Sequence, residues 1–321
     1  MVSHDTASAL IDRARPVVAI AGAPTHELRL ALLASAGQDV KLRQLFRGAE
    51  PLDASRLALD GKSATLFDAS AFTLPLEQLL WCLTRTSVLL FEPRNEPGLP
   101  ELIARLARDC DVPRVVGLAT QLSQPRVRER LGQIKPEWAS APVLAMQVKN
   151  QPLKRVAPLL LEELSAHLTP RGAPEGPLLF VPSRIDGPIA HGSPWRGSLQ
   201  PRAMVRMVGL NEASMVEVAA IEPVAAFRFS QPVTAGVKVF TSGQTSVVER
   251  SRAVFELREP GAMVGDLYCF GTRVGRVRLE DDLVVSIEGP PGLVTEWGAP
   301  FCIAHRTGFH QPPKISFGRW A

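Results

Sequence analysis

The order of strand-length and helix-length patterns changes at one point in the sequence, and this change constrains the fold most. Before it, buried-strand runs such as PVVAIAG (Pro16–Gly22) alternate with helical patterns such as HELRLALLASAG (His26–Gly37). Such alternation is typical of an α/β layer with largely parallel strands. After the Pro- and Gly-rich segment TPRGAPEGP (Thr169–Pro177), strand-length runs follow one another and helical patterns become scarce. We therefore expect an α/β part followed by a mainly antiparallel β-rich part, with a linker near 169–177.

Composition and charge narrow the class of protein. The chain has 321 residues, of which 45% are hydrophobic and 21% charged, so a sizeable core is feasible. Its net charge is +4, but residues 1–170 contain 20 basic and 18 acidic residues, and residues 171–321 contain 16 and 14. A nucleic-acid-binding protein usually concentrates its basic residues in one region. This even distribution argues against a nucleic-acid partner.

The cysteines and the hydropathy pattern bear on the compartment. The four cysteines, Cys82, Cys110, Cys269 and Cys302, are far apart and form no C-x-x-C pair. No signal peptide is visible, and no apolar run approaches 18 residues. We therefore expect reduced cysteines, no membrane association and a cytoplasmic protein.

Three motifs carry possible ligand chemistry, each with a simpler structural explanation. The turn AGAPTHE after the first strand lacks the Gly-Lys-Ser/Thr ending of a P-loop, so Thr25 is better explained as a helix N-cap. Cys302, His305 and His310 could ligate a metal, or they could belong to a C-terminal strand with surface histidines. The pair Asp281–Asp282 could share a cation with Glu288 or form a β-turn.

The stretch Ile221–Ala253 predicts three short strands, at Val224–Phe229, Val237–Thr241 and Ser246–Arg250. Because side chains alternate across a strand, Arg228 should lie on one face of a sheet and Phe227 and Phe229 on the other. Lys238 should project alone from an apolar strand. Such basic residues beside aromatic rings could bind a peptide carboxylate, or they could be edge charges that prevent strand addition.

The segment Ser183–Arg202 is a long polar stretch dense in Pro and Gly. It contains Arg184, Trp195 and Arg196, and an aromatic residue beside arginines on a loop is typical of a recognition surface. A long loop of this composition could equally be disordered. The candidate peptide-contact residues are Arg184, Trp195, Arg196, Phe227, Arg228 and Lys238.

Several segments together resemble ATP-grasp proteins of the peptide-ligase branch, which includes the microviridin-type ligases. The segment LIARLARDCDVPRVVGLATQLSQPRVRERL resembles the family's helix–strand–helix segment, and APVLAMQVK is similar to its next nucleotide-site strand. IEPVAAFRFSQPVTAGVKVFTSG resembles a strand pair of the family, and IEGPPGLVTEW its closing signature. The resemblance implies an ATP-grasp-like fold, with an N-terminal α/β domain at 1–115 and a degenerate ATP-grasp region at 116–321.

The chain departs from the family where ATP chemistry needs charged side chains. Ala145, Met146 and Gln147 stand where the phosphate-binding lysine should be, and Lys149 is offset. Gly289 and Pro290 stand in place of the magnesium-binding asparagine after Glu288, and Lys238 replaces an arginine.

These losses predict a pseudoenzyme without cofactor or metal. In the peptide-ligase branch the body of the ligase binds a leader peptide. We therefore expect a non-catalytic accessory protein of ribosomal natural-product biosynthesis, similar to the peptide-binding proteins of crocagin-type pathways. Its partners would be a precursor peptide and the tailoring enzymes, and pairing with a second copy or a homologous chain is compatible with this role. Two alternatives remain: an active carboxylate–amine ligase using Lys149, Glu288 and Asp282, and a metal-dependent enzyme centred on Cys302, His305 and His310.

Overall fold

The computed structural model divides the chain into two compact units. One unit comprises Thr6–Gly172, and the other contains Ala173–Ala321. The division lies within the predicted linker at 169–177, whereas residues 115 and 116 are consecutive positions of one strand. The structure describes residues 16–22, 25–37, 54–59, 62–69, 76–95, 98–146, 153–171, 175–182, 184–192, 194–209, 212–222, 226–230, 237–269, 272–281, 283–288, 293–305 and 314–321.

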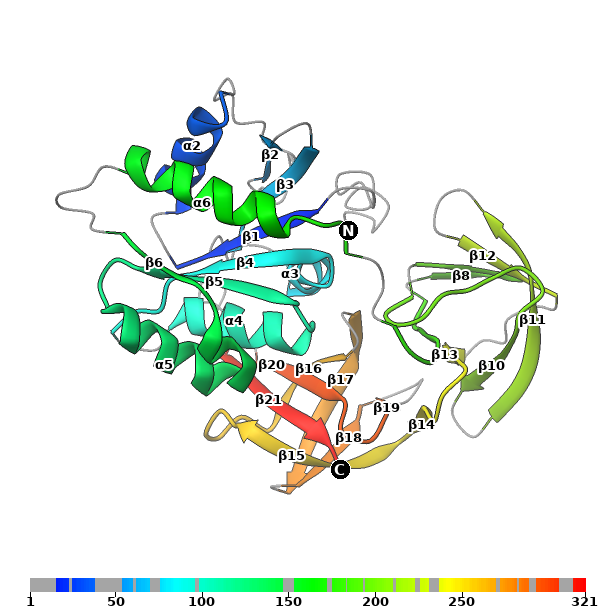
Figure 1. Ribbon diagram of the computed structural model, residues 1–321. Coiled ribbons are helices and arrows are strands. Elements are labelled where there is room, and N and C mark those ends of the chain that lie inside the picture. The colour runs from blue at the N-terminus through cyan, green and yellow to red at the C-terminus, as the bar shows by residue number, and fades with distance from the viewer. Residues whose placement is uncertain are drawn as a thin grey trace. The chain divides into compact units, whose positions relative to one another are not determined.

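The unit formed by Thr6–Gly172 is an α/β layer around a six-stranded sheet of order β2-β3-β1-β4-β5-β6. All neighbouring strands are parallel except β2 and β3. Helices α2 and α6 lie on one face of the sheet, and α4 and α5 on the other (Figure 1). The elements are β1 (Val17–Ala21), α2 (Thr25–Ser35), β2 (Ala54–Leu59), β3 (Lys62–Asp68), α3 (Leu76–Leu83), β4 (Thr86–Phe91), α4 (Leu99–Asp109), β5 (Arg114–Ala119), α5 (Gln124–Ile134), η1 (Pro136–Ser140), β6 (Val143–Ala145) and α6 (Leu153–His167).

The apolar runs explain this layer. Every residue of β1 and of β4 is buried, as expected for central parallel strands covered by helices on both faces. Helices α2 and α6 contribute Leu28, Leu32 and Leu160 to the core beneath them. The end of the unit is fixed by Arg171, whose guanidinium donates hydrogen bonds to the Leu83 carbonyl (3.3 Å) and the Cys110 carbonyl (2.8 Å). These carbonyls belong to the C-terminal ends of α3 and α4, where a cation is favourable.

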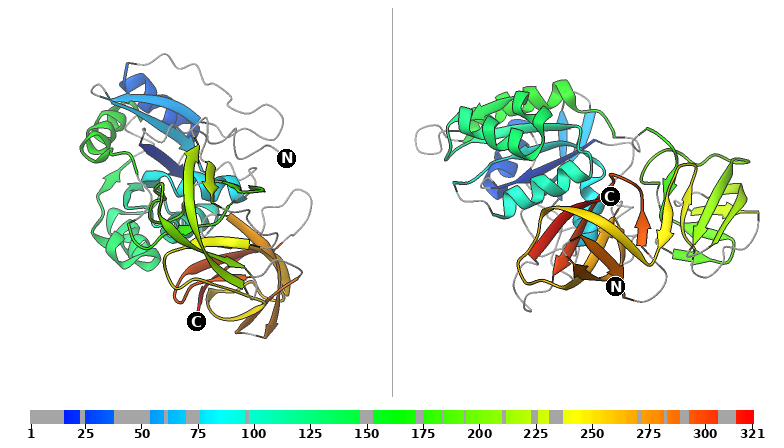
Figure 2. Two further views of the ribbon diagram at one scale, coloured as in Figure 1. Left: turned by 90° about the vertical axis from the view of Figure 1, so that its right-hand side faces the viewer. Right: turned by 90° about the horizontal axis from the view of Figure 1, so that it is seen from below.

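The unit containing Ala173–Ala321 is built from antiparallel strands. A seven-stranded sheet has the order β7-β13-β10-β11-β12-β9-β8, and a closed barrel has the order β15-β18-β17-β16-β20-β21. The yellow to red strands of this barrel curve round one another in Figure 2. The strands are β7 (Leu179–Phe180), β8 (Arg184–Asp186), β9 (Ile189–His191), β10 (Met204–Gly209), β11 (Glu212–Glu222), β12 (Ala226–Phe229), β13 (Val237–Thr241), β14 (Ser246–Val248), β15 (Arg250–Leu257), β16 (Val264–Cys269), β17 (Thr272–Asp281), β18 (Val284–Ile287), β19 (Leu293–Thr295), β20 (Pro300–His305) and β21 (Lys314–Trp320).

Each part of this unit has an apolar core. In the seven-stranded sheet, the rings of Phe229 and Phe240 stack with their centroids 4.2 Å apart, and Phe180 packs against Phe227 at 5.1 Å. In the barrel, Phe301 and Trp320 pack with their ring centroids 4.4 Å apart. The protein is thus a mixed α/β structure with mostly strands, including antiparallel sheets and a barrel, as the change of pattern at 169–177 predicts. No helix of the described residues has the length and apolar character to cross a membrane.

Candidate functional site

Strand β12 places two of the six predicted contact residues on opposite faces of the seven-stranded sheet. Phe227 and Phe229 are 5% and 2% exposed and belong to the core, whereas Arg228 is exposed on the outer face. The alternation predicted from FRF is therefore confirmed. Phe227 is a packing residue in this structure, and Arg228 is accessible to a ligand. Lys238 is a residue of β13, but its side chain lies outside the described part of the chain.

Arg184 lies on β8, at one edge of the sheet, and its side chain is 68% exposed. Its guanidinium pairs with Asp186 at 2.8 Å, and His191 contacts the same carboxylate at 3.0 Å. A three-residue strand with alternating charges is a common way of protecting a sheet edge from strand addition. In this environment Arg184 is best explained as a charge at the sheet edge.

Trp195 and Arg196 lie side by side in sequence but have different roles. Trp195 is half-buried against the core cluster of the barrel, and its backbone N–H donates to the Leu179 carbonyl at 2.8 Å. Arg196 instead forms a bidentate ion pair with Glu296, at 2.9 Å from Nη1 to Oε1 and 3.1 Å from Nη2 to Oε2. Its Nε donates to the Pro177 carbonyl at 2.9 Å. Each of the three nitrogens of this guanidinium thus has a partner within the chain.

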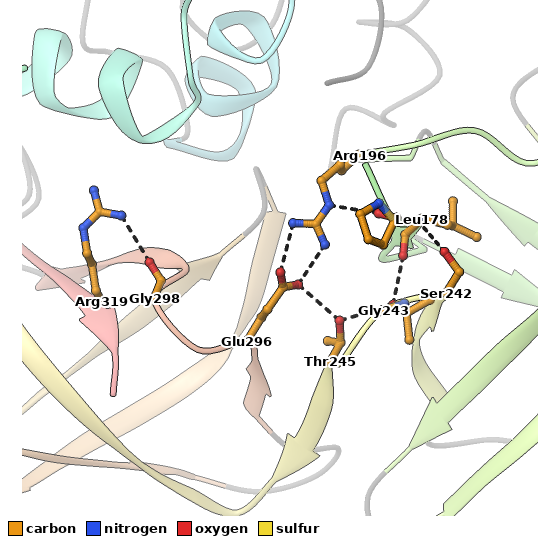
Figure 3. A network of polar contacts seen from close by, with 10 residues as sticks. Leu178, Arg196, Ser242, Gly243, Thr245, Glu296, Gly298 and Arg319 are labelled. Atoms are coloured by element: carbon orange, nitrogen blue, oxygen red, sulfur yellow. Dashed lines mark hydrogen bonds and ion pairs between the residues drawn. The ribbon is translucent and has the colours of Figure 1, made fainter. Parts of the chain in front are cut away.

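A network of hydrogen bonds surrounds this ion pair (Figure 3). Thr245 Oγ1 donates to Glu296 Oε2 at 3.3 Å, and Ser242 Oγ accepts the Leu178 N–H at 2.7 Å. The backbone at Gly197 lies close to the backbone at Gly176. A Cβ at position 197 would lie 2.8 Å from the Gly176 carbonyl oxygen, and the φ of Gly197 is 69°, so both the space and the conformation favour glycine. The network holds the segment before β7, the Arg196 loop and the Glu296 turn together.

Glu296 begins a tight turn, Glu296–Ala299, that we call the Trp297 turn. The Ala299 N–H donates to the Glu296 carbonyl at 2.9 Å, and Gly298 has a φ of 73°, which favours glycine at this turn position. Arg319 Nη1 donates to the Gly298 carbonyl at 3.1 Å, as Figure 3 shows. Between these fixed points, Trp297 is 87% exposed. Trp297 was not predicted as a site residue, although a glycine between strand-length runs, here Gly298, is a turn signal.

A second exposed feature lies on the outer face of β10, β11 and β12. Met204 and Met215 are 55% and 53% exposed, and Arg206 is the cross-strand partner of Met215. Glu217 is the partner of Met204, and its backbone pairs with Ser230, two positions beyond Arg228. We call the five side chains that share this face the Met–Arg face: Met204, Arg206, Met215, Glu217 and Arg228.

The Met–Arg face was also missed by the sequence analysis, apart from Arg228. Val205 and Met207 lie in the core, so Met204 and Arg206 must point outward. The alternation in MVRMV carries this signal, but it does not say which set of alternate residues faces the core. Pairing with β11 resolves the ambiguity, because Val216 and Val218 are buried on the same side as Val205.

Of the metal-site candidates, His305 is engaged in other contacts, and the expectation of a surface histidine is wrong for it. His305 is 4% exposed, its Nδ1–H donates to the Val264 carbonyl (3.0 Å), and its Nε2 accepts from Ser316 Oγ (2.8 Å). Cys302 is three residues earlier on the same strand and therefore points to the other face. His310 lies outside the described residues. Among the described side chains, no group of three or more His, Cys, Asp and Glu residues could hold a metal ion.

The carboxylate of Glu288 lies between two arginines, at 3.3 Å from Arg276 and 3.0 Å from Arg278. The side chains of Asp281 and Asp282, and the residue Lys149, lie outside the described part of the chain. Of the predicted cation site and the alternative ligase residues, the structure therefore describes only the side chain of Glu288. Its carboxylate pairs with two guanidinium groups.

The four cysteines are buried and none of them forms a disulfide, in agreement with the expectation of reduced thiols. Burial raises the pKa of the Cys82 thiol to about 12, against a smaller opposing effect of Arg85. Burial also raises the pKa of Cys110, and Asp109 adds to that shift. Neither thiol ionises near neutral pH, so neither is suited to nucleophilic chemistry.

The turn after β1 and the end of β4 lie close together at the carboxyl edge of the parallel sheet. The Glu92 N–H donates to the Ala21 carbonyl at 2.9 Å, and Arg94 Nη2 donates to the Gly22 carbonyl at 3.5 Å. The Glu92 side chain is 3% exposed, and burial raises its pKa to about 7 despite the opposing effect of Arg94. A carboxyl group at this position does not favour a phosphate, which agrees with the absence of a P-loop sequence.

Comparisons with known proteins do not place the chain in a family. No family model matches the sequence, and no curated protein matches it. Among solved structures, the translation elongation factor SelB of Methanococcus maripaludis in complex with the GTP analogue GppNHp has a TM-score of 0.46 and 10% identity, with 97% of this chain and 79% of that chain covered. Its apo form has a TM-score of 0.46 and 11% identity, with 95% and 79% covered. A bacterial selenocysteine-specific elongation factor has a TM-score of 0.45 and 12% identity, with 90% and 56% covered. Similarity at this level assigns neither a fold family nor a function.

Proposed function

We propose that this chain is a non-catalytic peptide-binding protein that holds a ribosomal precursor peptide and presents it to the tailoring enzymes of the same pathway. One observation carries the proposal: two methionines more than half exposed lie beside Arg206 on the outer face of β10 and β11, and Arg228 points to the same face from β12. Methionine side chains adapt to differently shaped apolar partners and are common at peptide-binding surfaces. The occupant would be an extended or helical segment with apolar residues beside carboxylates.

The charges of the Met–Arg face favour an acidic segment. The face has two arginines and one carboxylate, that of Glu217. A further exposed arginine, Arg202, lies two residues before β10. Peptide carboxylates would gain from these guanidinium groups, while the methionines would bury apolar side chains. Binding by side chains is favoured over strand addition, because the edge strand β8 is short and charged.

The position of the core supports a preformed surface. The inward sides of β10, β11 and β12 pack into one apolar cluster with Val205, Val216 and Phe229. A face supported in this way loses little conformational entropy on binding. The proposed surface therefore needs no rearrangement of the sheet.

The ATP-grasp ancestry suggested by the sequence is part of the proposal, with nucleotide chemistry lost. The pairing of Glu288 with Arg276 and Arg278 supports this loss, since its carboxylate already has cationic partners. Thermal unfolding with and without Mg-ATP tests it, because a ligand that binds only the folded state raises the melting temperature. A rise with Mg-ATP would favour an active ligase instead.

Binding of a labelled peptide tests the main proposal. The probe is a fluorescein-labelled peptide in which Asp and Glu alternate with Leu and Phe, measured by fluorescence anisotropy. The double substitution Met204→Ser and Met215→Ser should weaken binding about tenfold or more, since both apolar contacts are lost. Met263→Ser is the matched control, because Met263 is 47% exposed outside this face.

Charge substitutions separate the contribution of the arginines from that of the methionines. Arg206→Gln and Arg228→Gln should weaken binding and reduce its dependence on salt, whereas Arg184→Gln should change neither. Equal affinity of the parent protein and the double methionine variant would contradict the placement of the site. If the parent protein bound neither the acidic peptide nor the precursor peptide of its own pathway, the proposed function would be wrong.

A further inference from the structure

Trp297 is exposed to an extent that is unusual for tryptophan. Its side chain is 87% exposed, whereas Trp138 and Trp320 are 4% and 2% exposed, and Trp195 is half-buried. Tryptophan is highly buried on average, and exposed tryptophans are enriched at binding hot spots. Within the described part of the chain, the indole of Trp297 has no ring contact and its N–H has no hydrogen bond.

The turn that carries Trp297 is held from both sides. On one side, Glu296 is bound by Arg196 at 2.9 and 3.1 Å. On the other side, the Gly298 N–H donates to the Trp320 carbonyl at 2.8 Å, and the Gly298 carbonyl accepts from Arg319 at 3.1 Å. The indole is thus carried by a backbone that is already held in place, so binding of a partner needs little additional ordering of this turn.

The charges at the base of the turn are already paired within the chain. Arg196 pairs with Glu296, and Arg319 Nε donates to Glu256 at 2.9 Å. Beside Arg319, its cross-strand partner Val254 is 57% exposed. A phosphate-rich ligand would have to break these ion pairs, and a nucleic acid is therefore disfavoured. The surroundings suit an uncharged apolar side chain.

We propose that Trp297 is the docking point for a proline-rich polypeptide segment. Proline rings pack flat on an indole, and a polyproline II segment leaves its carbonyls free to accept a hydrogen bond from the indole N–H. Both the ring and the N–H of Trp297 are available for these contacts. This site is distinct in residues from the Met–Arg face and stands whether or not that face binds an acidic peptide.

Intrinsic fluorescence of the full chain tests the proposal. An acetylated polyproline peptide is titrated against the protein, and a glycine–serine peptide of equal length serves as the control. The proline peptide should shift the emission to shorter wavelength and protect it from acrylamide quenching. Trp297→Ala should abolish both changes and weaken binding at least about tenfold, as expected for a tryptophan hot spot.

Two further variants make the outcome decisive. Leu283→Ala removes another exposed apolar side chain of the barrel, 57% exposed, and should bind like the parent. Thermal unfolding of Trp297→Ala should match the parent, because an exposed side chain contributes little to stability. Absence of binding up to about 1 mM peptide, or equal binding by Trp297→Ala, would overturn the proposal. Trp297-dependent binding of a single-stranded oligonucleotide in place of the proline peptide would overturn it as well.

Discussion

Arg196 and Glu296 are 100 residues apart in sequence and form a bidentate ion pair with contacts of 2.9 and 3.1 Å. Their side chains are 23% and 22% exposed, so water screens the pair only partly. The pair connects the loop before β10 to the Trp297 turn that leads into β20. An arginine predicted to contact a peptide thus binds a carboxylate of its own chain.

Arg196→Lys tests whether this geometry stabilises the fold. Lysine keeps the charge but cannot form the bidentate contact or the Nε hydrogen bond to Pro177. We expect the free energy of unfolding to fall by about 1–2 kcal/mol, the range for partly buried charge-assisted hydrogen bonds. Urea denaturation measures it, with Arg184→Lys as the control at an exposed pair, where the change should be within about 0.5 kcal/mol. The Arg184–Asp186 pair also has two contacts, at 3.0 and 2.8 Å, so equal losses in both variants would show that partial burial gives the Arg196–Glu296 pair no special role.

Ser316→Ala tests the polar network inside the barrel. Ser316 Oγ donates to His305 Nε2 at 2.8 Å and accepts the Glu259 N–H at 3.1 Å. Ser316 is fully buried, so its loss leaves a histidine nitrogen and a backbone donor without partners. We expect destabilisation of about 1–3 kcal/mol, the cost of unsatisfied buried polar groups. Ser286→Ala, on a less buried part of the barrel, should leave the denaturation midpoint nearly unchanged.

The buried carboxyl of Glu92 should make stability depend on pH. Burial raises its pKa from 4.5 to about 7, so the folded state holds the proton that the unfolded state has already lost. The contribution of this group therefore falls as pH rises from about 4.5 to about 7 and is constant above that. Glu92→Gln keeps the side chain neutral and should remove this fall. Urea midpoints at about pH 5 and about pH 8 measure it.

The direction of the pH effect at Glu92 can be checked by comparison with a substitution at an exposed carboxyl group. Relative to the parent, Glu92→Gln should gain stability at the higher pH, whereas Glu137→Gln, at an exposed carboxyl, should follow the parent at both. A parent and a Glu92→Gln variant with parallel pH dependence would show that Glu92 ionises normally in the folded state.

Local patterns predicted the strands well, because side-chain alternation is a property of a few neighbouring residues. The predicted strand Val237–Thr241 has the same bounds as β13, and Ser246–Arg250 overlaps β14. Phe227, Arg228 and Phe229 have the predicted faces. The FRF alternation required no knowledge of the partner strands to separate Arg228 from the rings.

Contacts between distant segments could not be predicted in this way. Nothing near Arg196 in sequence indicates Glu296, and the exposure of Trp297 depends on that pairing and on Arg319. The same holds for His305, whose partners Val264 and Ser316 come from two other strands of the barrel. The alternation within one strand predicts which residues share a face of the sheet. It does not predict the order in which the strands pair to close a barrel.

Adjacent residues of β12 should separate stability from binding. Phe229 is 2% exposed, and its ring stacks on Phe240 with a centroid distance of 4.2 Å. Phe229→Ala removes this contact and leaves a cavity, so we expect the free energy of unfolding to fall by about 3–5 kcal/mol. Arg228→Ala changes an exposed residue of the outer face and should alter stability by less than about 0.5 kcal/mol. Urea denaturation of both variants measures this contrast.

The same two variants should have the opposite order in peptide binding under conditions where both are folded. Phe229→Ala leaves the charges of the Met–Arg face in place, so its affinity for the acidic peptide should stay within about threefold of the parent. Arg228→Ala removes a guanidinium, and its affinity should fall most at low salt, where screening is weakest. Anisotropy titrations at low and high salt measure the difference. If Arg228→Ala bound like the parent at low salt, Arg228 would be a solvated charge on the sheet, and the peptide would have to lie elsewhere.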